Sequence, residues 1–162
     1  MRHTVLVYCR CEDADMVLLQ TKDRPAWQAG KLNLPGGRMD PEDAGDPITA
    51  ALRELAEETG LTPPRAAVRE VGLLTGEEIR IHCVVAEVDA DLPLRPRAGE
   101  TEPVEWYHWP TVREDPRLIH HLRLIIALIR DGNQGWVVEH RPGEGDSRET
   151  VHVVRLPIPQ IG

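Results

Sequence analysis

The sequence predicts an α/β (α+β) domain in which a mixed β-sheet packs between helices. Short apolar runs bounded by turn residues alternate with two segments of helical periodicity, in the order strands, helix, strands, helix. The chain has 162 residues, of which 41% are hydrophobic, enough for one domain with its own core. We therefore expect a single domain over residues 1–162, with residues 131–162 as a C-terminal hairpin or tail.

Strands are expected on both sides of a central helix. Residues 4–8 and 16–20 are short, rich in strand-forming residues and separated by a polar turn, which predicts a hairpin of two core strands. Residues 21–37 hold too many Pro and Gly residues for a helix, although a short strand fits residues 32–34. Further strands are expected at residues 68–74, 79–88 and 104–109.

Two helices are predicted from capping residues and periodicity. The first begins after Asp46, a good N-cap that precedes Pro47, and ends before Gly60, which suits the left-handed C-terminal cap. The second spans residues 116–130, where apolar residues recur at helical spacing. Both helices should pack an apolar face on the sheet.

The tail contains two strand-like runs. Residues 136–139 and 151–156 flank a Gly-rich and charged segment, and this pattern predicts a hairpin. The hairpin could be a lid over a cleft, an interaction surface or the contact of a homodimer. The sequence is compatible with each of these roles.

The most distinctive segment is residues 53–61, RELAEETGL, which places three carboxylates on one stripe of the first helix. Glu57 and Glu58 lie about 60° and about 40° to either side of Glu54. Like charges at this spacing repel by a few tenths of a kcal/mol per pair, and Arg53 at the edge of the stripe offsets only part of that. One interpretation is a solvated acidic face. The other is a site for a hard divalent cation, which would turn the repulsion into attraction.

Gly37 and residues 53–61 together resemble the Nudix box at about residues 37–61, the signature of the Nudix hydrolase (MutT-like) family: G-x5-E-x7-R-E-U-x-E-E-x-G-U, where U is a bulky aliphatic residue. Residues 34–41, LPGGRMDP, resemble the loop that commonly enters this box. The resemblance implies the Nudix fold, an α/β/α sandwich in which the box forms a loop-helix-loop. The order of strands and helices extends the resemblance loosely to residue 130.

The box departs from the family pattern at its first glutamate. Counted back from Arg53, that glutamate would fall at Gly45, and the loop after Gly37 is two residues longer than the pattern. In the family this glutamate supports the site, whereas the later glutamates of the box carry the metal. Two hypotheses therefore follow: a hydrolase, or a binding module that senses a nucleotide. Three acidic residues of the longer loop could replace it: Glu42, Asp43 and Asp46.

The resemblance implies a site for Mg²⁺ or Mn²⁺. Glu57 and Glu58 would bind the metal, and Glu54 would be a further ligand or take part in activating water. The Gly37 carbonyl would add another ligand, and Arg53 would orient a glutamate. Metals held by carboxylates neutralise charge on phosphate oxygens and activate water. The implied reaction is hydrolysis of a nucleoside di- or triphosphate, or of another nucleoside diphosphate-X compound, by water attack at phosphorus.

A later loop is expected to complete the site with another acid. In MutT-like members this acid lies shortly before a strand that contains Trp. Glu100 stands six residues before Trp106, so it is our candidate for a distal ligand or general base. Glu102 and Glu105 are its rivals.

Three residues of the loop that enters the box could bind the nucleoside. Trp27 could stack on a base, Asn33 could read a base edge and Arg38 could hold a base or sugar, although Trp27 could equally be a buried packing residue. The adjacent His120 and His121 have no partner at metal-ligand spacing, so we expect no metal there.

Composition disfavours several classes of function. A formal net charge of −8 argues against a nucleic-acid polymer as partner. No apolar run approaches the roughly 20 residues that span a bilayer, and the start of the chain lacks the pattern of a secretory signal. Three cysteines without zinc-finger spacing predict free thiols. We therefore expect a cytoplasmic protein that binds a small nucleotide.

Overall fold

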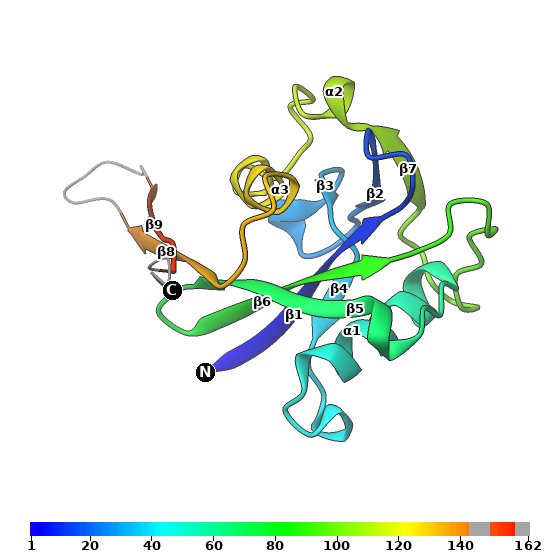
Figure 1. Ribbon diagram of the computed structural model, residues 1–162, viewed down its shortest axis with the longest axis horizontal. Helices are drawn as coiled ribbons and strands as arrows, with labels where there is room; N and C mark the ends of the chain where they lie inside the picture. Colours follow the sequence, from blue (N-terminus) through cyan, green and yellow to red (C-terminus); the bar gives the residue numbers. More distant parts are fainter. Residues whose placement is uncertain (143–149, 158–162) are drawn as a thin grey trace, which may run out of the picture.

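The computed structural model describes residues 1–142 and 150–157 (Figure 1). Its framework is a six-stranded mixed sheet of order β4-β1-β6-β5-β8-β9. The pairs β1–β6 and β5–β8 are parallel, and the other neighbours are antiparallel. The strands are β1 (Arg2–Arg10), β4 (Gly36–Arg38), β5 (Val68–Thr75), β6 (Ile79–Glu87), β8 (Trp136–Pro142) and β9 (Thr150–Arg155).

A second sheet of three strands has the order β3-β2-β7. The hairpin predicted for residues 4–8 and 16–20 is wrong, because β1 pairs with β4 and β6 whereas β2 pairs with β3 and β7. Residues 5–9 of β1 are buried at every position, which is the pattern of a central strand with neighbours on both edges. The strands of the second sheet are β2 (Met16–Thr21), β3 (Leu32–Asn33) and β7 (Val104–His108).

Helix α1 (Pro47–Thr59) has the predicted ends. The Asp46 side chain accepts a hydrogen bond from the Ile48 backbone at 3.0 Å, and Gly60 has a φ of 77° at the other end. These caps satisfy backbone groups that a helix leaves unpaired. The remaining short helices are α2 (Trp109–Val112) and the 3₁₀ turns η1 (Ala26–Gln28), η2 (Pro41–Asp43) and η3 (Arg65–Ala67).

Helix α3 (Leu122–Arg130) is shorter than the predicted helix over residues 116–130. The backbone before it bonds elsewhere: Leu32 donates to the Arg117 carbonyl at 2.9 Å, and Ile119 donates to the Leu32 carbonyl at 3.1 Å. A segment that uses its amides and carbonyls on β3 cannot also form a helical ladder. The apolar residues of the predicted helix are buried as expected, but the first of them, Leu118 and Ile119, belong to a turn that precedes α3.

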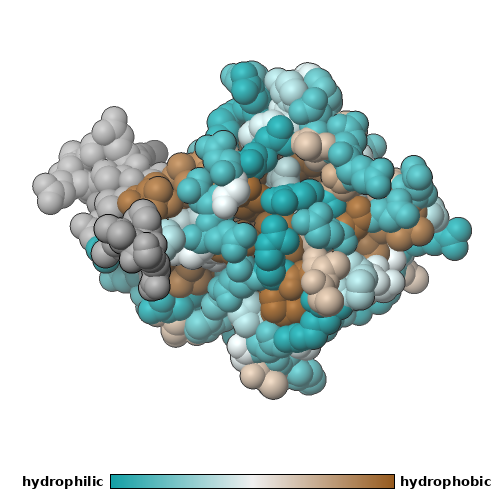
Figure 2. Space-filling model, viewed as in Figure 1, coloured by the Kyte–Doolittle hydropathy of each residue, from teal (hydrophilic) through white to brown (hydrophobic). Residues whose placement is uncertain are grey.

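The two longer helices cover opposite faces of the large sheet (Figure 1). Leu55 of α1 packs with Val7 and Val84, while Ile125 of α3 packs with Leu6 and Val85. The result is the α/β/α sandwich expected for the Nudix fold. Most of the surface seen in Figure 2 is hydrophilic, with hydrophobic patches between. Within the described ranges, no helix has both the length and the apolar character needed to span a bilayer.

The predicted tail strands are present as β8 and β9, which extend the large sheet beyond β5. Trp136 of β8 is fully buried and lies over Gly72, where an added Cβ would come within 2.2 Å of the indole ring. The tail is therefore anchored to the domain through β8. The Gly-rich connection predicted between the strands lies outside the described residues.

Candidate functional site

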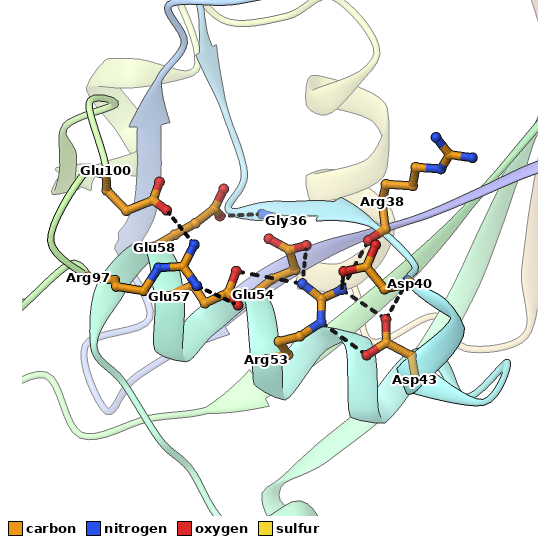
Figure 3. A network of polar contacts seen from close by, with 10 residues as sticks. All are labelled: Gly36, Arg38, Asp40, Asp43, Arg53, Glu54, Glu57, Glu58, Arg97 and Glu100. Atoms are coloured by element: carbon orange, nitrogen blue, oxygen red, sulfur yellow. Dashed lines mark hydrogen bonds and ion pairs between the residues drawn. The ribbon is translucent and has the colours of Figure 1, made fainter.

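Helix α1 directs its glutamates toward the start of β4 (Figure 3). Glu54 and Glu58 are only 8% and 7% exposed. Glu58 Oε2 accepts a hydrogen bond from the Gly36 backbone at 2.8 Å. A Cβ at Gly37 would lie 2.5 Å from Glu54 Oε1, so the glycine makes room for this carboxylate. The interpretation of the stripe as a solvated acidic face is therefore wrong for these two residues.

Of the three acidic residues of the longer loop, Asp43 is the one that is both buried and hydrogen-bonded to Arg53. Its carboxylate accepts two hydrogen bonds from Arg53, Nε to Oδ1 at 3.1 Å and Nη2 to Oδ2 at 2.8 Å, and the residue is 2% exposed. The rivals lie elsewhere: Glu42 is exposed, and Asp46 caps α1.

The sequence points to Asp43 when the family pattern is counted forward from Gly37 instead of back from Arg53. Counted forward from Gly37, the pattern G-x5-E reaches Asp43. The two extra residues follow it as Ala44 and Gly45, whose φ angles are 53° and 76°. These two left-handed residues form a bulge between η2 and α1.

Arg53 also aligns the site itself. Its Nη1 donates to Glu54 Oε1 at 2.9 Å, and its Nη2 donates to the Arg38 carbonyl at 3.0 Å. One guanidinium therefore joins η2, the end of β4 and α1. Because Asp43 fixes Arg53, the position of Glu54 depends on a residue eleven positions away in the chain.

Burial dominates the electrostatics of the stripe. Burial raises the pKa of Glu58 to about 7, opposed by the hydrogen bond from the Gly36 amide and reinforced by the charge of Glu54. Burial also raises the pKa of Glu54, against the hydrogen bond from Arg53. The hydrogen bond from Arg53 lowers the pKa of Asp43. Burial thus disfavours the charged forms of Glu54 and Glu58, which a bound cation would favour.

The donor set suits a hard divalent cation. Carboxylate oxygens are the ligands that such cations prefer, and the absent side chain at Gly37 leaves room beside Glu54. Among the described residues, however, no group of three or more His, Cys, Asp or Glu side chains is arranged to hold a metal ion. Glu57 is instead paired with Arg97, whose Nη1 lies 3.0 Å from Glu57 Oε1 and whose side chain is 60% exposed.

The structure distinguishes the three candidates for the distal acid. Glu100 lies 3.6 Å from Arg97 Nη2, on the side of the site that holds Glu57 and Glu58 (Figure 3). Glu102 is instead buried against Lys22, with 2.6 Å between Oε2 and Nζ. Glu105 contacts the Tyr107 hydroxyl at 3.1 Å on the surface. Arg97 itself was missed, because a lone Arg in a Pro-rich loop carries no motif.

The three residues predicted to bind the nucleoside differ in their exposure and in the direction of their side chains. Trp27 is 57% exposed with Lys31 Nζ 6.0 Å from its ring centre, so the alternative of a buried Trp is wrong. Asn33 is buried, and its Oδ1 accepts from the Leu34 backbone at 2.8 Å. The Arg38 side chain points away from Glu57 and Glu58 (Figure 3).

Gln20 is a buried polar residue that sequence reasoning missed. It lies opposite Asn33 in the β2–β3 ladder and is fully buried. Within the described residues its amide atoms fall short of any hydrogen bond, yet the amide is near enough to Glu58 to oppose the rise of its pKa. Gln20 lies near the end of the apolar strand β2, and no motif in the sequence indicates that its side chain faces the site.

The raised pKa of Glu58 predicts how stability depends on pH. Without metal, the folded state binds more protons than the unfolded state between pH 4.5 and about 7. The free energy of unfolding should therefore fall as the pH rises through this window, by about 2–3 kcal/mol. The measurement is the free energy of unfolding by urea in EDTA, at several pH values, for the wild type and for Glu58→Gln. The difference between the two proteins isolates the contribution of Glu58, because the other titrating groups contribute equally to both. A difference that is flat with pH would contradict the prediction.

Comparison with known proteins gives the family. The family model of the NUDIX domain matches residues 1–129. The MutT protein from Bacillus halodurans is 20% identical, with a TM-score of 0.69 over 96% of this chain and 97% of that one. The NUDIX domain of Shewanella oneidensis NrtR, solved with ADP ribose, is 22% identical, with a TM-score of 0.66 over 80% of this chain and 86% of that one. No curated protein sequence matches. The chain belongs to the Nudix hydrolase family.

Proposed function

We propose that this hydrolase cleaves a phosphoanhydride bond in a nucleoside di- or triphosphate, or in another nucleoside diphosphate-X compound, with Mg²⁺ or Mn²⁺. The observation that carries the proposal is the burial of Glu54 and Glu58 against Gly36 and Gly37. Buried carboxylates on one helix face destabilise the fold unless a cation compensates them. The site therefore favours a bound cation, because the chain itself supplies only part of the positive charge that these carboxylates require.

Each residue has a proposed role. Glu57, Glu58 and the Gly37 carbonyl hold the cation, and Glu54 is a ligand or positions the attacking water. When bound, the cation neutralises phosphate charge and makes the water more acidic. Glu100, freed from Arg97, is a further ligand or accepts the proton of that water. Arg53 keeps Glu54 in place.

The nucleoside is assigned to the side of the site that β2, β3 and η1 form. Trp27 offers an exposed aromatic face, and Asn33 lies opposite Gln20 in the ladder. The ligand in the Shewanella structure, ADP ribose, is itself a nucleoside diphosphate linked to another group. That ligand supports the substrate class without naming the substrate of this chain. Arg38 remains a weaker candidate, since its side chain is directed elsewhere.

A panel of nucleotides with Mg²⁺ tests the proposal. Nucleoside triphosphates, diphosphates and nucleoside diphosphate sugars are incubated with the protein, and release of phosphate, pyrophosphate or mononucleotide is measured. At least one substrate should turn over, and EDTA should stop the reaction. Absence of product from every member of the panel, with either metal, would refute the proposed reaction.

Arg97 favours a second candidate, a nucleotide sensor without turnover. Its guanidinium bridges Glu57 and Glu100, where it provides positive charge beside the stripe. In a hydrolase, Arg97→Gln should tighten Mg²⁺ binding because a competing cation is removed. In a sensor, calorimetry should instead show nucleotide binding without Mg²⁺, lost in Arg97→Gln. Turnover in the panel would exclude the sensor.

Gly37→Ala should lower Mg²⁺ affinity and kcat by tenfold or more. Its Cβ would meet Glu54 Oε1 at 2.5 Å, so the carboxylate must leave its position. A displacement of this size is enough to cost about 10²-fold in rate. Gly45→Ala is the control: it has no atom within 4 Å of its Cβ and suffers only the backbone cost of its φ of 76°, about 1 kcal/mol. Equal kinetic losses in the two variants would contradict the prediction.

The cysteines support a cytoplasmic location. Cys9, Cys11 and Cys83 are free and buried in the structure. Reduced thiols persist mainly in the cytosol, so a cytoplasmic location is part of the proposal.

A further inference from the structure

A second cavity lies on the α1 side of the large sheet, beyond the beginning of that helix. Its volume is about 640 Å³, and its wall includes the ends of β1 and β4, the loop after β4 and His82 of β6. The charged or titratable groups that line it belong to Met1, Arg2, His3, Arg38, Asp40 and His82. None of the catalytic glutamates is among its lining residues.

The cavity is cationic in an acidic protein. The side chains of Arg2 and Arg38 have no ion pair or hydrogen bond with any residue in the described ranges. The single acid, Asp40, lies 3.6 Å from Arg53 Nη2, which offsets its charge. Two unpaired guanidinium groups therefore face one concave surface, although the chain has a formal net charge of −8.

The wall of the cavity holds a chain of hydrogen bonds across three strands. Glu70 Oε1 of β5 lies 2.7 Å from His82 Nδ1, and His82 Nε2 lies 3.0 Å from His3 Nδ1. The two rings are nearly coplanar, at 21°. If Nδ1–H of His82 donates to Glu70, Nε2 of His82 accepts from Nδ1–H of His3, because the bond at one ring nitrogen sets the role of the other. This arrangement leaves His3 Nε2 available to a ligand.

We propose that this cavity binds a phosphoryl group, either as free inorganic phosphate or as the terminal group of a small metabolite. Guanidinium groups of Arg2 and Arg38 match phosphate oxygens in shape and charge. A phosphoryl group has a second pKa of about 6, so near neutral pH part of it keeps a P–OH group. His3 Nε2, which is an acceptor in this arrangement, can accept a hydrogen bond from that P–OH group. Sulfate has no such proton near neutral pH.

The proposal is independent of the hydrolase activity, because the cavity and the carboxylate stripe are separate. Arg53 stands between them: it contacts Asp40 on the cavity side and Glu54 on the other. Phosphate bound at the stripe would need a divalent cation, whereas phosphate bound in the cavity should not. Failure of one proposal therefore leaves the other intact.

Titration of the metal-free full chain with inorganic phosphate, followed by amide NMR shifts in EDTA, tests the proposal. Saturable shifts are expected at residues 2–3, 38–40 and 82, with a dissociation constant of about 1 mM. Arg38→Gln and His3→Gln should each weaken binding about tenfold, the loss expected for one charged hydrogen bond. Sulfate should bind about tenfold more weakly than phosphate.

Arg80→Gln is the matched control. Arg80 lies opposite His3 in the β1–β6 ladder and is exposed, but it does not line the cavity. Its loss should leave phosphate affinity within about twofold of the wild type, because its exposed guanidinium lies outside the cavity and is screened by salt. Equal weakening by Arg80→Gln and Arg38→Gln, no saturation by about 50 mM phosphate, or shifts confined to the stripe would each overturn the proposal.

A comparison of two ligands distinguishes the sources of the phosphoryl group. Glycerol phosphate binding more tightly than inorganic phosphate would identify a metabolite as the source, and the reverse would identify the free ion.

Discussion

Glu58→Gln is expected to lower kcat by about 10²–10⁴-fold. The substitution keeps the size of the side chain and its hydrogen bond from the Gly36 amide, which is 2.8 Å long with glutamate. It removes the charge that would hold the cation. A metal contributes several kcal/mol to stabilising the transition state, and each 1.36 kcal/mol is a factor of ten in rate. Glu57→Gln should have a similar effect.

Two measurements separate this loss of activity from misfolding. Because the pKa of Glu58 is about 7 without metal, Glu58→Gln should not destabilise the metal-free protein at pH 6. At pH 8 the variant should be the more stable of the two. Glu77→Gln, in the exposed turn after β5, removes the same charge away from the site and should keep full activity. Unchanged kcat in Glu57→Gln and Glu58→Gln would mean that the stripe does not hold the catalytic metal.

Local signals in the sequence predicted α1 and its acidic stripe. The Asp46 cap, Pro47 and Gly60 define the helix through the backbone next to them, and helical geometry alone places Glu54, Glu57 and Glu58 on one side. The strands were also located to within a few residues, except β4 (Gly36–Arg38), which lies in the Gly-rich segment that was predicted as a loop. The partners of the strands were not predicted correctly, because a run of apolar residues does not say which strand lies beside it. The assumed β1–β2 hairpin failed for that reason.

Contacts between distant residues account for the other differences. Arg97 approaches Glu57 because its backbone amide donates to the Glu57 carbonyl at 2.7 Å, although the two residues are forty positions apart in the sequence. Gln20 lies near Glu58 because β2 of the second sheet packs in the same apolar cluster as α1. Arg117 and Ile119 exchange backbone hydrogen bonds with Leu32 of β3 instead of extending α3. No periodicity in the sequence encodes these contacts.

Asp43→Ala is expected to lower the free energy of unfolding by about 3 kcal/mol and the melting temperature by roughly 6–12 °C. The Asp43 carboxylate is 2% exposed and accepts two hydrogen bonds from Arg53. Its removal leaves a partly buried guanidinium without its main partner. Glu42→Ala, in the same 3₁₀ turn but exposed, should change stability by less than about 0.5 kcal/mol.

The pH dependence and the activity of this variant identify the ion pair as the cause. Arg53 lowers the pKa of Asp43, so the stabilisation is present above the usual carboxyl pKa and is lost as the pH falls through the lowered value. The stability difference between wild type and Asp43→Ala should therefore shrink in acid. Activity should also fall about tenfold or more, because Arg53 no longer aligns Glu54. Asp43→Glu restores the family's residue type and should recover more activity than Asp43→Asn, which retains the shape but not the charge. Equal activity in these two variants would show that Asp43 acts only through packing.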